Sequence, residues 1–379
     1  MQFREYMKFT EVSAVFLFSI YLFNPILSPY MKGLGFNEIQ MSVLFSFLPL
    51  SMIIFSPLMG KLSDLTSRRH VILIGIGFEI LAIILYVSGS SIWFIGLARV
   101  LDAIGYSTVI LISLAKVEDV IDSERRGEYT GWMETLKFAG KMIAPVAGAV
   151  IADFYFIEAP FFVSLVILAI MFGVLFKKEK IPKISKRPLN PVEEIKEFLS
   201  HKKLKGMAIL GIVMHGAQPG MVLFLPLFIV YEMGMELSYV GIAYFVLEVM
   251  HIFQFWFGKK SDEYGEWKFV LGGCLTMAFG LGLLYFSSSF LLLSVFLFIQ
   301  GIGRSMWNVS AWSLMSKVGE ENKKEGEIAA SYASIAKIGS FLSFLLSGLV
   351  ATSLGIQSLF LINAVIIVFG VILAYNFLK

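Results

Sequence analysis

The chain has 379 residues, of which 57% are hydrophobic and 16% are charged, and its formal net charge is +3. Soluble globular proteins contain roughly 45–50% apolar and about 25% charged residues, so this composition excludes an ordinary soluble enzyme. The single cysteine, Cys274, excludes an internal disulfide and any metal or iron–sulfur site built from cysteines.

Apolar runs bounded by charged residues or glycine predict twelve transmembrane helices, because about 20 apolar residues are needed to cross a bilayer. The first six are expected at residues 9–31, 39–60, 70–89, 92–115, 129–152 and 158–176. The second six are expected at residues 206–230, 237–258, 268–287, 289–316, 327–351 and 355–378. The first run lacks a convincing cleavage site, so we expect a retained helix rather than a signal peptide. The expected fold class is therefore an all-α integral membrane protein.

The two sets of spans are separated by residues 177–205, a polar stretch that is too charged to enter the bilayer. Asn190 and Pro191 form a helix-start signal. The apolar residues that follow on one face predict a short amphipathic surface helix, with contact to the membrane or a partner as the alternative. These residues are Val192, Ile195, Phe198 and Leu199. The expected domains are an N-terminal bundle at 1–176, this linker, and a C-terminal bundle at 206–379.

The basic residues predict the orientation of the chain. Of the 31 Lys and Arg residues, 25 lie in the two ends, the linker and alternate loops, and only Lys32 lies in the opposite loops. Because cytoplasmic loops are enriched in Lys and Arg, both termini and the linker are expected in the cytoplasm, with the protein in the cell membrane. The other five fall within expected spans. They are Arg99, Lys137, Lys141, Arg304 and Lys337.

An internal repeat is visible when the sequence is shifted by about 198 residues. The segment Gly60, Lys61, Ser63 and Asp64 then falls on Gly258, Lys259, Ser261 and Asp262. At the same shift, Asp102, Ile104 and Gly105 fall on Gln300, Ile302 and Gly303. These matches indicate duplication and predict twelve transmembrane helices in two pseudo-symmetric six-helix bundles. Parallel repeats of this kind occur in secondary transporters, where the substrate site lies between the halves near the midplane.

The loop after the second expected span contains Gly60, Leu62, Asp64, Arg68 and Arg69. With these residues the sequence resembles the major facilitator superfamily, whose pattern here is Gly-x-Leu-x-Asp-Arg-x-Gly-Arg-Arg. The chain departs from the pattern at Leu65 and Ser67, and a weaker second copy contains Gly258, Asp262 and Gly265. The resemblance covers essentially the whole length. It implies a conformational latch on the cytoplasmic side, formed by Gly60, Asp64, Arg68, Arg69, Gly258 and Asp262; the alternative is a loop that only fixes topology.

Two further spans carry family-like patterns. In the fourth span, Arg99, Asp102 and Gly105 resemble the family's Arg-x-x-Gln-Gly-x-Gly pattern. The fifth span resembles the pattern of proton-coupled drug antiporters, with alanine in place of two glycines. The matching residues there are Gly140, Ala144, Pro145, Gly148 and Ala149. Small residues at four-residue spacing permit close helix packing, and a proline permits a bend. Ordinary small-residue packing is the alternative interpretation.

Ionisable residues within spans usually pair with one another and mark a pathway. Arg99 and Asp102 lie three residues apart on one helix face, and a face of the fifth span carries Glu134, Lys137 and Lys141. A carboxylate can be ionised while it is paired and protonated when its partner leaves. We therefore expect Asp102 or Glu134 to carry the proton, with Arg99, Lys137 or Lys141 as partner. Fixed structural ion pairs are the alternative. Glu79, alone in the third span, is expected to be peripheral or near a helix end.

Polar and aromatic residues of other spans are candidates for a substrate cavity. Glu248 is expected to face Arg304 and Lys337, and histidines can titrate near neutrality. Prolines at matching places of the first and seventh spans, Pro25, Pro29, Pro219 and Pro226, predict broken, site-forming helices. The cavity candidates are Tyr21, Asn24, His215, Gln218, Glu248, His251, Arg304, Trp307, Asn308 and Lys337, with Trp312 as a further aromatic. For the aromatic residues, lipid contact or a place in the helix core is the alternative.

Several function classes find no support in the sequence. There is no Gly-x-x-x-x-Gly-Lys-Ser/Thr loop for ATP, no cluster with metal-ligand spacing, and no soluble segment long enough for a catalytic domain. We expect no enzyme activity, cofactor, metal or nucleic-acid partner. The expected function is secondary active transport of a small organic solute by alternating access, by a monomer in the lipid bilayer. Proton-coupled efflux of drug-like or amphipathic compounds is favoured. The alternatives are a proton-coupled symporter of a sugar, nucleoside or organic anion, and a sensor or scaffold that does not transport.

Overall fold

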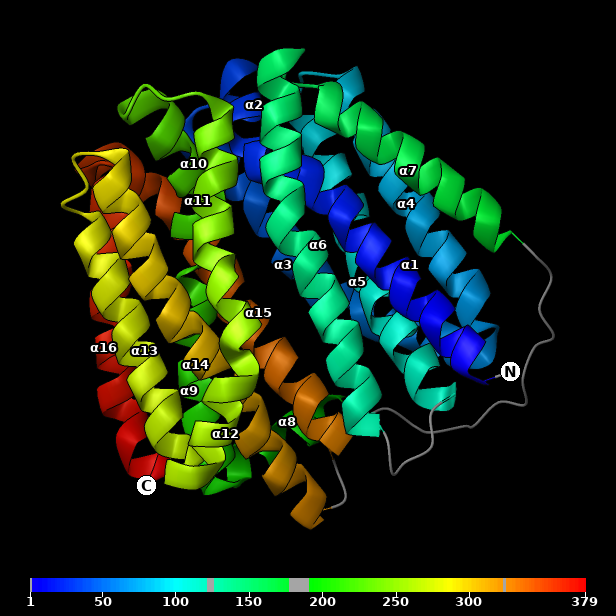
Figure 1. Cartoon of the computed structure of the whole chain (residues 1–379), viewed down its shortest axis with the longest axis vertical. Coiled ribbons are helices and arrows are strands. Elements are labelled where there is room, and N and C mark those ends of the chain that lie inside the picture. The colour runs from blue at the N-terminus through cyan, green and yellow to red at the C-terminus, as the bar shows by residue number, and fades with distance from the viewer. Residues whose placement is uncertain (1, 121–125, 177–190, 323–324) are drawn as a thin grey trace. The chain divides into compact units, whose positions relative to one another are not determined.

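The computed structural model describes residues 2–120, 126–176, 191–322 and 325–379, and every regular element in these ranges is helical (Figure 1). The first half contains α1 (Gln2–Phe23), α2 (Leu27–Gly33), α3 (Glu38–Leu65), α4 (Arg68–Ser88), α5 (Ile92–Val120), α6 (Arg126–Phe154) and α7 (Ala159–Leu175). The second half contains α8 (Pro191–Ser200), α9 (Lys202–Gly216), α10 (Leu225–Leu227), α11 (Leu237–Val249), α12 (Gln254–Tyr264), α13 (Glu266–Leu284), α14 (Phe290–Asn322), α15 (Glu325–Leu354) and α16 (Ile356–Leu378).

The helices account for the expected membrane crossings. In the described ranges, eleven helical stretches are long and apolar enough to cross a membrane. The sixth expected span is α7, which is apolar but has 17 residues. The prediction of a twelve-helix, all-α membrane fold is confirmed.

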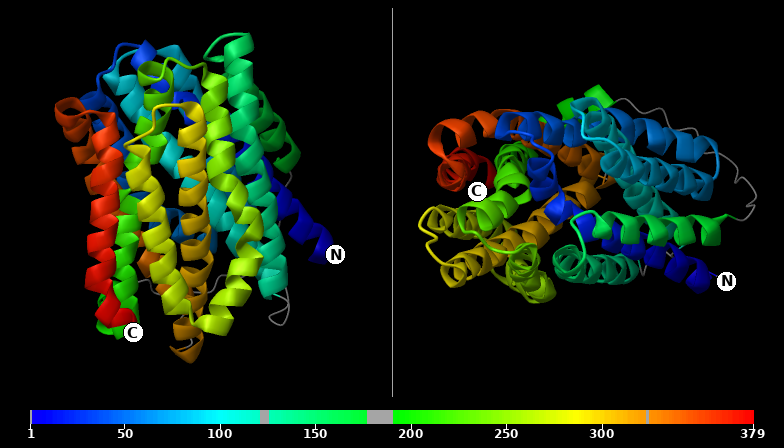
Figure 2. Two further views of the ribbon diagram at one scale, coloured as in Figure 1. Left: turned by 60° about the vertical axis from the view of Figure 1, so that its left-hand side comes forward. Right: turned by 90° about the horizontal axis from the view of Figure 1, so that it is seen from above.

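The chain divides into two compact units. The first contains Met1–Gln40, Phe47–Arg187 and Glu236–Phe245, and the second contains Met41–Ser46, Pro188–Met235 and Val246–Lys379. In the first unit α4 packs along α5, and α1 contacts α5, α6 and α7. In the second unit α13 packs along α14 and α16, and α9 lies beside α16, as Figure 2 shows.

The sequence duplication is also visible in the structure, because equivalent helices of the two repeats begin and cross at equivalent residues. The starts of α4 and α13, at Arg68 and Glu266, are 198 residues apart. A Cβ atom added to Gly105 of α5 would lie 2.8 Å from the carbonyl oxygen of Gly75 in α4. At the equivalent positions, a Cβ atom on Gly303 would lie 2.6 Å from the carbonyl oxygen of Gly273. Both helix pairs therefore cross where glycines let the two backbones approach closely.

Local signals explain where some helices begin. Before α3, the side chain of Asn37 accepts a hydrogen bond from the backbone N–H of Gln40 at 2.9 Å, and the Gln40 side chain accepts one from the N–H of Asn37 at 3.0 Å. This reciprocal arrangement satisfies two backbone donors at the start of a helix. Gly35, with φ of 93°, makes the turn that precedes it.

The prediction that the first and seventh spans are broken is confirmed. After α1 the chain forms a 3₁₀ turn at Asn24–Ile26, which contains Pro25, before it continues as α2. After α9, π-helical turns at Gly220–Phe224 and Phe228–Glu232 flank α10, which contains Pro226. Proline has no N–H to donate, so the α-helical ladder is interrupted at these places.

The linker helix begins at Pro191, as predicted, and it packs against α9 and α15. Phe198 is 2% exposed, whereas Leu199 is 39% exposed. The seventh span also begins earlier than expected, at Lys202, because lysine side chains can keep their ammonium groups in water while the backbone is already helical.

Candidate transport site

The first unit contains a buried network of one arginine, one aspartate and one tyrosine. Arg99 donates from Nη1 to Oδ2 of Asp102 at 2.8 Å and to the hydroxyl of Tyr86 at 3.3 Å. The Tyr86 hydroxyl in turn donates to the same Asp102 oxygen at 2.9 Å. Arg99 and Asp102 are 2% and 1% exposed. The predicted Arg99–Asp102 pair is confirmed. Tyr86 was not predicted, because it lies on α4 rather than on α5.

Glu79 lies within the same helix pair, and the expectation that it is peripheral or near a helix end is wrong. It occupies the middle of α4, and its side chain is fully buried. Gly105 leaves the space for it: a Cβ atom on Gly105 would lie 2.7 Å from Oε2 of Glu79. The charges that act on Glu79 are those of Asp102 and Arg99. The crossing of α4 and α5 thus gathers two carboxyl groups and one guanidinium.

The basic residues of the fifth span lie on α6. Lys141 Nζ lies 5.1 Å from the ring centroid of Tyr21 on α1, a distance at which a cation is attracted to an aromatic face. Lys137 is buried, and Asn24 is half-buried in the 3₁₀ turn that follows α1. The side chain of Glu134 lies outside the described residues. The proton-carrier role expected for it therefore remains a prediction.

The small residues of the antiporter-like segment pack α6 directly against α1. A Cβ atom on Gly148 would lie 1.8 Å from the carbonyl oxygen of Leu22, and one on Gly140 would lie 3.2 Å from that of Ala14. Ala144, between them, is fully buried. The expected close packing is confirmed at these positions.

The other side of α6 contacts the start of α11 within the first unit. A Cβ atom on Gly241 would lie 2.7 Å from the carbonyl oxygen of Pro145. Near the end of α6, the carboxylate of Asp153 accepts hydrogen bonds from the backbone N–H groups of Leu237 and Ser238 at 3.0 and 2.6 Å. Asp153 therefore caps the N-terminus of α11, where a negative charge is favourable. This cap is not predictable from the sequence, because its partners are 84 and 85 residues apart in the chain.

The second unit contains an ion-pair cluster that the sequence analysis expected in part. Arg304 donates from Nη1 to Oε1 of Glu248 at 2.7 Å. Nδ1 of His251 lies 3.4 Å from the other carboxylate oxygen of Glu248. Glu248 is 5% exposed, so the carboxylate is buried between its two partners. The expected pairing of Glu248 with Arg304 is confirmed.

A second polar cluster surrounds His215. Nδ1 of His215 is 3.2 Å from Nε2 of Gln218, and the hydroxyl of Ser340 donates to Oε1 of Gln218 at 2.9 Å. The rings of Trp307 and Tyr332 lie edge-on to the His215 ring, with centroids 6.1 and 6.5 Å away. The structure thus brings together three of the predicted cavity residues, His215, Gln218 and Trp307.

Two donors in this cluster have no hydrogen-bond acceptor among the described residues. They are the indole N–H of Trp307 and the hydroxyl of Tyr332, both of which are buried. The charges of Lys337 and Arg304 act on His215, which places these basic residues close to the same cluster. Asn308 is half-buried next to Trp307 in the chain, and the ring of Trp312, 45% exposed, packs against Tyr332.

Three residues of the expected latch, Arg69, Asp262 and Gly258, take part in contacts within their own units. Arg69 is buried and donates from Nε to the carbonyl oxygen of Leu175 at 2.7 Å, so it ties the start of α4 to the end of α7. Asp262 accepts a hydrogen bond from Lys317 Nζ at 3.2 Å. A Cβ atom on Gly258 would lie 3.2 Å from Val309. Open space surrounds Gly60, Arg68 is half-buried, and the Asp64 side chain lies outside the described residues.

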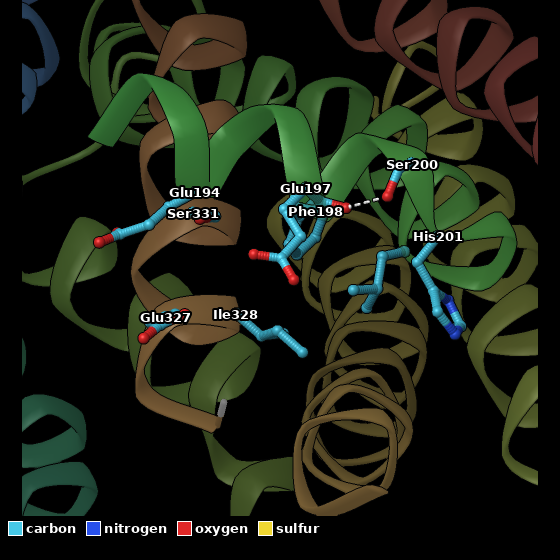
Figure 3. Close-up of a pocket in the computed structure, with 9 residues that line it drawn as sticks. Glu194, Glu197, Phe198, Ser200, His201, Glu327, Ile328 and Ser331 are labelled. Carbon is cyan, nitrogen blue, oxygen red and sulfur yellow. Dashed lines mark hydrogen bonds between the residues drawn. The ribbon is translucent and has the colours of Figure 1, made fainter. Parts of the chain in front are cut away.

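A pocket of about 250 Å³ lies in the second unit, and its lining shares no residue with these clusters (Figure 3). Its lining consists of Glu194, Glu197, Phe198, Ser200, His201, Leu204, Glu327, Ile328 and Ser331. In Figure 3 the linker helix α8 and the start of α15 form two of its walls. Within the described part of the chain, no group of three or more His, Cys, Asp or Glu residues is placed to hold a metal ion.

Comparison with known proteins places this chain in a family. The family model of the Major Facilitator Superfamily matches residues 12–318 and 243–379. An uncharacterised transporter of this type from Methanocaldococcus jannaschii is 25% identical over 358 residues, which are 92% of each chain. The multidrug resistance protein MdtG of Escherichia fergusonii is 24% identical over 388 residues, covering 94% of this chain and 90% of the relative. A solved structure of a nucleoside transporter NupG variant superposes with a TM-score of 0.82 at 14% identity, over 99% of this chain and all of that one. The chain belongs to the major facilitator superfamily of membrane transporters.

Proposed function

We propose that this transporter exports drug-like or amphipathic compounds in exchange for protons. The observation that carries the proposal is the buried network of Arg99, Asp102 and Tyr86. An ionised carboxylate in a membrane span is costly unless it is paired, and residues of this kind commonly serve as proton relays. The tight α6–α1 packing at Gly140, Ala144 and Gly148 and the similarity to the multidrug resistance protein MdtG also favour export.

In the proposed mechanism, Asp102 is ionised while Arg99 donates to it. A substrate, or the change between the two access states, draws Arg99 away. The carboxylate then takes up one proton from water, since an unpaired charge at this depth is unfavourable. When Arg99 returns, the proton is released on the other side of the membrane. Glu134, Lys137 and Lys141 are the second proposed set of proton-coupling residues.

The residues that we propose to bind substrate are aromatic and polar, and each repeat contains some of them. Tyr21, beside Lys141, and the cluster of His215, Gln218 and Trp307 offer aromatic rings and a few hydrogen-bonding groups. Such a mixture suits an amphipathic ligand. The cavity set also includes Asn24, Glu248, His251, Arg304, Asn308 and Lys337.

The remaining features of the proposal concern the whole chain. We propose functional halves at 1–176 and 206–379, joined by the cytoplasmic linker 177–205, in a monomer of the cell membrane with both termini in the cytoplasm. Gly60, Asp64, Arg68, Arg69, Gly258 and Asp262 are proposed to close the cytoplasmic side in the outward-facing state.

The second candidate function is proton-coupled symport of a sugar, nucleoside or organic anion. The specific observation that favours it is the basic character around His215, where Lys337 and Arg304 are close and two buried donors have no acceptor among the described residues. This arrangement can receive an anionic or hydroxyl-rich solute. The similarity of the fold to a nucleoside transporter is compatible with either candidate.

Vesicles with a reconstituted protein and an imposed pH gradient separate the two candidates. The probe is ethidium, a permanently charged cation that cannot be trapped by protonation. Exchange predicts ethidium accumulation in vesicles that are acidic inside, with little accumulation in protein-free vesicles or with Asp102→Asn. Accumulation of a nucleoside or an organic anion in vesicles that are acidic outside would instead establish symport. A sensor would bind solute without any gradient-driven flux.

A further inference from the structure

The third span carries a carboxyl group that the proposed mechanism does not use. Glu79 is fully buried between α4 and α5, and neither of its carboxyl oxygens has a hydrogen-bond partner among the described residues. Carboxylates in membrane spans are rarely left without a partner, because an ionised group in an apolar interior costs several kcal/mol. The location of Glu79 therefore calls for an explanation other than packing.

The charges around Glu79 do not balance if every acid is ionised. Arg99, Asp102 and Tyr86 are the titratable groups that face it from α5 and from α4 itself. The helix α7 (Ala159–Leu175), which also packs along α4, contains no titratable residue. From α2, the hydroxyl of Tyr30 donates to the backbone carbonyl of Tyr86 at 2.8 Å. Arg99 and Tyr86 both donate to Asp102, so the guanidinium compensates that carboxylate. An ionised Glu79 would add an uncompensated negative charge to a fully buried site.

The second repeat contains the equivalent helix crossing, between α13 and α14, without ionisable side chains at the four corresponding positions. The residues 198 positions further along, on α13 and α14, are Met277 for Glu79, Leu284 for Tyr86, Leu297 for Arg99 and Gln300 for Asp102. All four are buried, and the crossing is made by glycines at the same positions. The geometry therefore forms without any of the ionisable groups. The charged set in the first repeat is therefore an addition to a crossing that uncharged residues form in the second repeat.

We propose that Glu79 is a proton-binding residue, and that Glu79 and Asp102 hold one proton between them beside Arg99. This inference deepens the proposed function and rests on it, since a proton site in a transporter serves coupling. With one proton on Glu79, the three groups sum to zero charge. The proton is taken from water when the site is open and returned to water on the other side. Gly105 is the positioning residue, because only glycine leaves space for the Glu79 carboxyl.

Infrared difference spectroscopy of the purified protein tests the site directly. In wild-type protein, raising the pH should remove a carbonyl band of one protonated carboxyl group. Glu79→Gln should lack this band, and Glu11→Gln, a change at an exposed acid of α1, should retain it. In Asp102→Asn, Glu79 becomes the acid beside Arg99, and the band should be lost at lower pH than in wild type.

Each alternative result contradicts a defined part of the proposal. A band that persists in Glu79→Gln overturns the assignment to Glu79, and a band unaffected by Asp102→Asn overturns the shared proton. A protonated glutamate is well mimicked by glutamine, and methionine occupies the equivalent position of α13. Failure of both Glu79→Gln and Glu79→Met to fold would therefore also overturn the proposal. Transport adds a separate measurement: wild-type coupling retained in Glu79→Gln contradicts the inference, whereas a titrating Glu79 without gradient-driven flux contradicts the proposed function alone.

Discussion

Arg99 and Asp102 form a buried ion pair in which each charge compensates the other. Both side chains are almost fully buried and share one hydrogen bond, with Tyr86 bound to each. Removing one partner of a buried ion pair leaves an uncompensated charge and costs about 3–5 kcal/mol, whereas exchanging both for well-packed residues is often neutral. The second repeat supplies such residues, Leu297 and Gln300.

The first prediction concerns this pair. Arg99→Leu alone should destabilise the protein by about 3–5 kcal/mol. The double variant Arg99→Leu/Asp102→Gln, which reproduces the second repeat, should regain most of this stability while proton-coupled flux stays lost. Unfolding in detergent and flux in vesicles measure the two effects separately. A double variant that is no more stable than Arg99→Leu would refute the interpretation.

The pair itself was predictable from the sequence, but its surroundings were not. A spacing of three residues on one helix places Arg99 and Asp102 on the same face. Glu79 and Tyr86 come from the preceding helix, and their positions depend on how deeply α4 and α5 cross. Gly75 and Gly105 determine how closely the two helix backbones approach. Neither the helical periodicity nor the number of charged residues predicts this distance.

At the scale of helices, the contact of α6 with α1 leaves no space at Gly148. A methyl group there would overlap the backbone of Leu22, whereas open space surrounds Gly77 in the middle of α4. Small residues let membrane helices pack closely, so the two glycines should respond to substitution in opposite ways.

The second prediction follows from this contrast. Gly148→Ala should cost at least about 3 kcal/mol or prevent folding, because the backbone of α1 must move. Gly77→Ala should be neutral or stabilise the protein by up to about 1 kcal/mol, through helix propensity. Thermal unfolding of the two variants in the same detergent provides the measurement. Equal effects of both substitutions would exclude a special role of the α6–α1 contact.

Among the described side chains of the linker helix α8, only Phe198 is buried, and this yields the third prediction. Phe198 is 2% exposed, while the adjacent Leu199 is 39% exposed. Phe198→Ala should release α8, because truncating a buried phenylalanine costs about 3–5 kcal/mol and a ten-residue helix is marginal by itself. Hydrogen exchange in residues 191–200 should rise sharply. Leu199→Ala is the control and should leave exchange in this segment near the wild-type rate.

Helix existence was predicted from the sequence far better than helix ends and helix contacts. Apolar run length identified all twelve spans, since crossing a bilayer demands it. The cap of α11 by Asp153 and the early start of α9 at Lys202 were missed. These features depend on residues that are distant in the chain or on side chains that reach away from their backbone.

At the scale of the whole molecule, the fourth prediction concerns the orientation of the chain in the membrane, and it follows from the distribution of Lys and Arg. The chain has one cysteine, Cys274, which is buried, so an added cysteine can be labelled selectively. Ser90, between α4 and α5, and Glu263, near the end of α12, are both exposed. In intact cells an impermeant maleimide should label Ser90→Cys and should not label Glu263→Cys. The reverse pattern would invert the proposed topology.

The two π-helical turns of the seventh span have a geometric consequence for the molecule. A π turn contains one residue more than an α turn and keeps its backbone hydrogen bonds at i to i+5. Conversion of such a turn to the α form moves a single residue into the next turn. The rest of the span then shifts by about 1.5 Å along its axis and rotates by about 100°. A conversion at Gly220–Phe224 or at Phe228–Glu232 would therefore turn the rest of this span by one residue step, so that it presents a different face.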